Sequence, residues 1–135
     1  MQGIRITLTK EREALLHKVQ REVNRLLYIS DKEQFGKSEY WTDGYTGQGD
    51  CEDFAEEKQK QLIAHGFPEL CMARCSCLTE DNESHAVLVV NTSEGYMVLD
   101  NRYKRVCTWQ YLEAIGYDIN YRPDYLINYV EEKDE

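Results

Sequence analysis

The sequence contains no apolar run that approaches the length of a membrane span, so we expect no membrane insertion. Its start lacks the positively charged segment and apolar core that make up a secretion signal. It also contains no internal repeat, low-complexity tract or linker. We therefore expect one folded domain over residues 1–135, which is long enough for a hydrophobic core without disulfides.

Positive charge is scarce, because 16 Lys and Arg residues stand against 25 Asp and Glu residues, for a formal net charge of −9. This balance argues against nucleic acid or an anionic membrane as the main partner, and it permits cation binding. The chain also lacks an even set of cysteines: its five cannot all pair internally, which predicts a reducing environment. Together with the missing signal, this favours a cytoplasmic location, or a periplasmic one if the chain is a processed form.

Cys71, Cys75 and Cys77 lie close together but lack the two-residue spacing of a zinc knuckle. No second Cys or His pair lies at a suitable distance. We expect these cysteines in the core or in a strand rather than on a metal.

Hydrophobic periodicity predicts a mixed α and β chain. The expected elements in chain order are a short strand or arm at 4–8, a helix from about Thr9 to Leu27, a polar loop over 29–48, a helix over 51–65, a strand at 70–78, a hairpin of 85–91 and 96–101, a short helix at 108–115 and a final strand at 125–129. The helix over 51–65 follows a glycine-rich approach and begins with a cysteine, and the other elements are interpreted around it.

Asp50 is a good N-cap for that helix, which places Cys51 in the first turn. There the unpaired backbone N–H groups and the helix dipole favour the thiolate form of a cysteine. The neighbouring carboxylates of Asp50, Glu52 and Asp53 oppose this effect. Cys51 therefore needs a cationic partner or a metal nearby to become reactive, and the rest of the sequence must supply one.

The hairpin offers a partner, because His85 opens one strand and Asp100 ends the other. An even-numbered loop puts both side chains on one face of the sheet: a loop of 91–94 sets them directly opposite, and a loop of Ser93 and Glu94 sets them diagonally. An odd-numbered loop separates them.

A Cys–His–Asp triad follows if the helix and the hairpin meet. In it, Cys51 is the nucleophile, His85 the general base and acid, and Asp100 the residue that orients the ring. The Cys51 backbone N–H and the Gln48 side chain would stabilise the oxyanion. The alternative is a buried structural cysteine and an ordinary histidine at a strand end.

Three segments resemble the bacterial transglutaminase-like cysteine peptidases. They are Gly49-Asp50-Cys51-Glu52-Asp53-Phe54-Ala55 with Lys58, Leu62 and Gly66 following, then His85-Ala86-Val87-Leu88, and finally Val98-Leu99-Asp100-Asn101, with Trp41 upstream. The resemblance implies an α+β, papain/transglutaminase-like fold in which the helix carrying Cys51 packs on an antiparallel sheet. It also implies the triad roles given above.

Characterised members of that family include calcium-dependent periplasmic proteases that release biofilm adhesins. The resemblance implies calcium ligands at Asp50 and Glu52, and less directly at Asp53. This chain departs from those proteases in its length and in lacking an export signal, and it is closer to the compact members often associated with phages or prophages. The competing interpretation is that Asp50 is an ordinary N-cap and the other two are first-turn acids that complement the helix dipole.

The leading hypothesis is a thiol hydrolase that cleaves a peptide or amide bond in a protein or peptide substrate through a thioester on Cys51. One alternative is a transglutaminase or acyltransferase that uses the same triad. Another is a non-catalytic binding or assembly protein that retains the fold.

Overall fold

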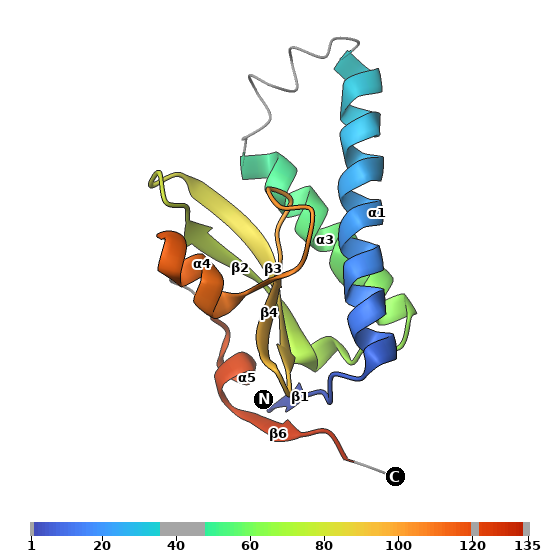
Figure 1. The fold of residues 1–135 in the computed structure, drawn as a ribbon, viewed down its shortest axis with the longest axis vertical. Helices are drawn as coiled ribbons and strands as arrows, with labels where there is room; N and C mark the ends of the chain where they lie inside the picture. The colour runs from blue at the N-terminus through green and yellow to red at the C-terminus, as the bar shows by residue number, and fades with distance from the viewer. Residues whose placement is uncertain (1, 36–47, 120–121, 134–135) are drawn as a thin grey trace.

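The computed structural model describes the backbone of residues 2–35, 48–119 and 122–133, and the side chains of these ranges except for 26–35 and 48–50. Its centre is an antiparallel sheet with the order β2 (Met72–Leu78), β3 (Ser84–Thr92), β4 (Gly95–Leu99) and β5 (Cys107–Thr108). The helix α3 (Gln48–Ala64) packs on β2 and β3, and α1 (Lys10–Phe35) lies beside it (Figure 1). This arrangement confirms the predicted α+β class, with the helix that carries Cys51 packed on an antiparallel sheet.

The remaining elements complete the two ends of the described chain. They are β1 (Gly3–Arg5), the 3-10 turn η1 (Glu69–Cys71), α4 (Trp109–Ile115), α5 (Asp124–Ile127) and β6 (Tyr129–Glu131). β1 and β6 pair in parallel, so segments far apart in the sequence form a second, two-stranded sheet.

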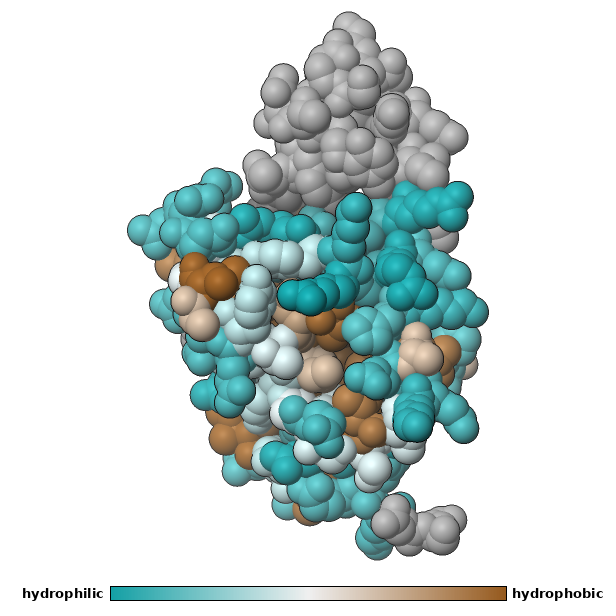
Figure 2. Space-filling model, in the orientation of Figure 1, coloured by the Kyte–Doolittle hydropathy of each residue, from teal (hydrophilic) through white to brown (hydrophobic). Residues whose placement is uncertain are grey.

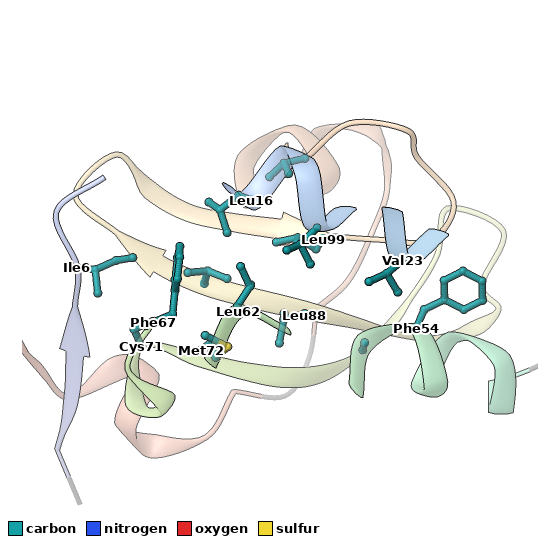
Figure 3. Packing of buried hydrophobic residues seen from close by; sticks show 14 residues of the cluster. Ile6, Leu16, Val23, Phe54, Leu62, Phe67, Cys71, Met72, Leu88 and Leu99 are labelled. Carbon is teal, nitrogen blue, oxygen red and sulfur yellow. The ribbon is translucent and has the colours of Figure 1, made fainter. Parts of the chain in front are cut away.

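The four-stranded sheet buries both of its faces. On one face, Met72, Leu88 and Leu99 pack with residues of α1 and α3, among them Leu16 and Leu62 (Figure 3). The alternate residues of the same strands point the other way and pack against α4; they include Cys75, Cys77, Val87, Val89 and Val98, which meet Trp109 and Leu112. Because side chains alternate along a strand, each strand contributes to both hydrophobic clusters.

Several sequence-based expectations are correct in type but wrong in extent. α1 continues to Phe35, so residues 29–35 of the predicted loop are helical, in keeping with the helix-favouring run Lys32-Glu33-Gln34. The predicted loop over 36–47 lies outside the described residues. α3 begins at Gln48, so Asp50 lies inside the helix and is not its N-cap. β2 begins at Met72 because residues 69–71 form the 3-10 turn.

The predicted final strand at 125–129 is largely wrong. Residues 124–127 form the helical turn α5, which begins after Pro123, and the backbone N–H of Leu126 donates to the Pro123 carbonyl at 3.0 Å. A proline just before an aspartate is a helix-start signal, and here it outweighs the alternating pattern. The strand itself starts at Tyr129, where β6 pairs with β1.

Figure 2 shows one face of the molecule, where hydrophilic residues cover most of the surface and apolar residues form only small patches. Among the helices of the described ranges, none combines the length and apolar character that a membrane span requires.

Candidate active site

His85 and Asp100 come from neighbouring strands, and the hairpin register brings them together. β3 and β4 are joined by Ser93 and Glu94, and Leu88 pairs with Leu99, so His85 and Asp100 are diagonal neighbours on one face. The His85 Nε2 atom lies 2.7 Å from Asp100 Oδ1, and both residues are buried. The diagonal arrangement is the one predicted for a two-residue loop.

The Asp100 carboxylate is held by donors on both of its oxygens. Oδ1 accepts from the backbone N–H of Arg102 at 2.9 Å in addition to its bond with His85, and Oδ2 accepts from the Tyr117 hydroxyl at 2.6 Å. Burial alone would raise the pKa of Asp100, but the bonds from His85, Tyr117 and Arg102 outweigh burial and lower it. Asp100 is therefore kept as a carboxylate in a buried site.

A second layer of contacts holds Tyr117 in place. The Arg102 side chain donates through Nη1 to the Tyr117 hydroxyl at 2.8 Å and forms a two-pronged ion pair with Glu80 at 2.9 and 2.8 Å. The bond from Arg102 is the main reason that the pKa of Glu80 falls to about 2. This chain of contacts runs from the surface at Glu80 to the buried Asp100.

Cys51 lies in the first turn of α3 and is only 2% exposed. Its side chain hydrogen-bonds to the His85 ring. Burial lowers the pKa of His85, but the bonds to Asp100 and Cys51 outweigh burial and raise that pKa to about 9. These contacts favour the protonated form of the His85 ring next to Cys51.

The other four cysteines are also free and buried. Burial raises the pKa of Cys71, Cys75 and Cys77 to about 12 in each case, and it raises the pKa of Cys107 as well. A thiol with such a pKa is not a nucleophile at neutral pH. Their positions in the core agree with the expectation that they are packing residues, and they separate chemically from Cys51, which contacts His85.

Comparison with known proteins gives the family of the chain. Residues 1–118 match the family described as bacterial transglutaminase-like cysteine proteinases (BTLCP). This chain belongs to that family. The match confirms the family predicted from the segments around Cys51, His85 and Asp100, and it assigns the chain to the cysteine peptidases with a transglutaminase-like fold.

Two solved structures of Legionella pneumophila LapG, one of them EGTA-treated, are similar to this BTLCP chain. Each is 28% identical with a TM-score of 0.47, and the match covers 59% of this chain. It covers 42% of the EGTA-treated chain and 43% of the other, so this chain matches less than half of LapG. No curated protein is similar enough to count as a match.

The predicted oxyanion and calcium residues lie at or near the start of α3. Gln48 and Asp50 are in the helix, but their side chains lie outside the described ones, as does all of Trp41. Glu52 and Asp53 are described and exposed. Among the described side chains, no group of three or more His, Cys, Asp or Glu residues is arranged to hold a metal ion.

Sequence reasoning missed Tyr117 and Arg102, which fix the Asp100 carboxylate. Arg102 carries a weak signal, since a residue two positions after an aspartate often donates its N–H to that side chain. Tyr117 carries none, because it reaches Asp100 only through the path of the chain after α4. Gly116 ends α4 in a left-handed conformation, with φ of 117°, and directs the next residue back toward the sheet.

Proposed function

We propose that this BTLCP chain is a thiol hydrolase that cleaves a peptide or amide bond through Cys51, His85 and Asp100. The single observation that carries the proposal is the His85 ring, which bonds to Asp100 at 2.7 Å and also interacts with the Cys51 side chain. These contacts favour a protonated ring beside the sulfur, and that charge stabilises a thiolate.

The reaction has two halves. The Cys51 sulfur attacks the carbonyl carbon of the substrate and forms a C–S bond; His85 then gives its proton to the leaving nitrogen, the C–N bond breaks, and a thioester and a free amine result. His85 next takes a proton from water and the resulting hydroxide attacks the thioester carbon; the C–S bond then breaks, and a carboxylic acid, the Cys51 thiolate and a protonated His85 result. Asp100 keeps the ring in the orientation that both transfers need.

The charge that develops on the carbonyl oxygen needs donors. The Cys51 backbone N–H and the Gln48 side-chain amide are the groups proposed for this role, because the start of a helix presents unpaired N–H groups. Replacing Gln48 by Ala is expected to lower the rate of cleavage about a hundredfold or more without preventing alkylation of Cys51, since alkylation forms no oxyanion.

The direct test is alkylation of the folded protein with iodoacetamide near neutral pH, followed by mass spectrometry of the labelled cysteines. Cys51 is expected to react first, and His85→Ala is expected to slow its reaction, because the thiolate loses its cationic partner. Cys51→Ala is the control for labelling elsewhere. A folded protein whose Cys51 stays unlabelled at neutral pH would show that the nucleophile is assigned wrongly.

Hydrolysis and acyl transfer use the same three residues, so only the products separate them. A peptide substrate incubated with and without an added primary amine distinguishes the two: hydrolysis yields the free acid in both cases, whereas a transglutaminase yields the amide when the amine is present. If the chain is instead a non-catalytic binding protein, Cys51→Ala would leave partner binding intact. In that case the unmodified protein would show no turnover either.

We further propose that the acidic start of α3 binds calcium. Glu52 and Asp53 supply hard carboxylate oxygens at the surface, and Asp50 is the third candidate, but six to eight oxygens are needed, so carbonyls or water must complete the set. Added calcium is expected to raise the melting temperature, and a chelator is expected to reverse the rise. Glu52→Gln is expected to reduce the shift, with Glu113→Gln on α4 as the control. A melting temperature that calcium does not change would remove this proposal and leave the triad untouched.

A further inference from the structure

Two polar side chains occupy positions where the helical pattern calls for apolar ones. On α1, Gln20 stands one turn after Leu16 in the buried stripe, and on α3, Lys58 stands between Ala55 and Leu62. Both are 0% exposed. A lysine is almost never fully buried without a strong reason, since the desolvation of its charge costs several kcal/mol, on the order estimated for buried ions.

The two side chains meet each other, because α1 and α3 pack side by side. The Lys58 Nζ atom donates to Gln20 Oε1 at 2.8 Å. This bond fixes which end of the Gln20 amide faces the lysine, so the NH2 group must point the opposite way. The Phe54 ring centre lies 5.8 Å from Nζ and adds a cation–π contact.

The NH2 group of Gln20 points at the turn that follows β4. Its Nε2 atom donates to the carbonyl oxygens of Asp100 at 2.9 Å, Tyr103 at 2.8 Å and Arg105 at 3.1 Å. Asn24, one helical turn further along α1, donates to the same Tyr103 carbonyl at 3.0 Å. Gln20 thus holds the main chain of the residue whose side chain orients His85.

Asp100 is consequently fixed from two directions. Tyr117 and the Arg102 backbone hold its carboxylate, and Gln20 holds its carbonyl. Lys58 also lies close enough for its charge to interact with that of Asp100, and this interaction partly offsets the burial that lowers the pKa of Lys58 to about 7.

We propose that Lys58 and Gln20 are positioning residues of the active site: the ammonium group of Lys58 orients the Gln20 amide, and the amide holds the 100–105 turn so that Asp100 meets the His85 ring. Neither residue touches the reacting atoms. The proposal rests on the proposed function for its catalytic meaning, whereas the effect on His85 can be measured without a substrate.

The test compares Lys58→Met with Gln20→Met. Methionine is close in length to both side chains and has no donor, so each variant breaks the link at a different point. Lys58→Met removes a positive charge near Asp100, whereas Gln20→Met keeps that charge. If positioning is the cause, both variants lower the pKa of His85, measured by NMR titration of its ring, by about one unit, a tenfold loss of preference for the imidazolium.

Neither variant substitutes any of the other groups that face His85. They are Cys51 on α3, Asp100 after β4, Tyr117 after α4 and the more distant Glu80. The double variant Lys58→Met/Gln20→Met is expected to lose no more than Gln20→Met alone, because the two residues act in series. It also avoids the unpaired Gln20 Oε1 that Lys58→Met alone would leave, so it keeps the test usable if Lys58→Met alone does not fold.

Lys60→Met is the matched control, since Lys60 is exposed on the same helix and should leave His85 unchanged. The pH profile of Cys51 alkylation is the second readout, and the part of it that follows the protonation of His85 is expected to lie about one pH unit lower than in the unmodified protein. A lower melting temperature with an unchanged His85 pKa would mean a purely structural role and overturn the proposal. So would a rise of that pKa in Lys58→Met alone, which would indicate a direct charge effect. If Cys51 fails to react even in the unmodified protein, the proposed function fails and the His85 titration still decides this inference.

Discussion

At the scale of single residues, Asp100 is the main group that keeps the His85 ring charged. Burial disfavours a protonated His85, so the raised pKa of that ring depends on the carboxylate at 2.7 Å and on the bond to Cys51. The bond between His85 and Asp100 also lowers the pKa of Asp100, against the effect of the burial of Asp100. The pair is therefore stable as carboxylate and imidazolium, and each partner keeps the other charged.

Asp100→Asn tests this dependence. An asparagine keeps the size of the side chain and a hydrogen-bonding oxygen but removes the negative charge, so the pKa of His85 is expected to fall from about 9 toward or below its ordinary value of about 6.5. NMR titration of the His85 ring measures it, with Asp118→Asn at an exposed position as the control. A His85 pKa that stays near 9 would mean that Cys51 alone charges the ring.

Tyr117→Phe tests the support of Asp100 from the other side. It removes the hydroxyl that donates to Oδ2 at 2.6 Å and leaves a buried carboxylate oxygen without that donor, while the ring still packs in its cluster. A hydrogen bond to a charged group contributes about 1.5–3 kcal/mol, and we expect a loss of that order in the free energy of unfolding, measured by urea titration. Tyr111→Phe, on the exposed side of α4, should change it by less than about 0.5 kcal/mol.

The difference between His85 and Tyr117 shows which residues of the site a sequence can reveal. His85 and Asp100 were predictable as neighbours because a short hairpin fixes the parity of its register, and the two-residue loop allows only one relation between them. Tyr117 lies 17 positions from Asp100 and after another helix, so no local periodicity connects them. Gln20 and Lys58 left a signal of a different kind, as polar residues inside apolar stripes.

At the scale of secondary structure, the end of α4 is what delivers Tyr117 to the site. Thr108 begins this helix by accepting from the Tyr111 backbone N–H at 3.1 Å, and Gly116 ends it with φ of 117°. A Cβ on Gly116 would lie 2.9 Å from Glu80 Cβ and 3.3 Å from Glu80 Cα. Gly116 therefore lies against Glu80, the residue that pairs with Arg102.

Gly116→Ala is expected to be more destabilising than Gly66→Ala. Both glycines end helices with positive φ, so both substitutions carry a left-handed penalty of about 1–2 kcal/mol. A Cβ on Gly66 meets nothing within 4 Å, so the second variant isolates that penalty. The additional clash should also disturb the Glu80–Arg102 pair and lower the pKa of His85. Equal losses of unfolding free energy in the two variants would show that Glu80 moves away from the added Cβ without a free-energy cost.

The same elements show where local sequence signals compete. The α4 helix was predicted with its cap and its stop because Thr108 and Gly116 both carry unambiguous signals. At 124–129, an alternating pattern typical of a strand coincided with Pro123 and Asp124, which favour a helical start, and the start signal prevailed. The N-terminus of α3 was misplaced by three residues, since Gln48 and Gly49 carry no strong helix signal of their own.

At the scale of the whole molecule, both hydrophobic clusters contain thiols whose ionisation opposes folding. Cys71 lies in the cluster beneath α1 and α3, and Cys75 and Cys77 lie in the cluster beneath α4. Burial raises the pKa of all three to about 12, whereas an unfolded cysteine ionises near about 8.5. Between these values the folded chain holds protons that the unfolded chain has released, so the free energy of unfolding falls as the pH rises.

His85 contributes in the same direction at lower pH. Its pKa is raised to about 9 in the folded chain, so its stabilising effect is complete below the unfolded value of about 6.5 and is lost as the pH rises through 9. Lys58 acts in the opposite sense, because its folded pKa of about 7 lies below the unfolded value of about 10.4. Above pH 9 the three thiols together outweigh the opposite contribution of Lys58 to the free energy of unfolding. The protein should therefore lose stability steeply in mild alkali.

Cys75→Ala isolates one thiol in this balance. The substitution is expected to destabilise the protein at every pH by leaving a small cavity, but it removes one ionising group from the unfolded chain. Its unfolding free energy should therefore fall less steeply than that of the unmodified protein between pH 9 and pH 11, by up to about 1.4 kcal/mol per pH unit. Urea unfolding at several pH values measures both slopes, and Ser76→Ala, the exposed neighbour on β2, should keep the original one. Parallel curves for Cys75→Ala and the unmodified protein would mean that the Cys75 thiol ionises as readily in the folded chain as in the unfolded one.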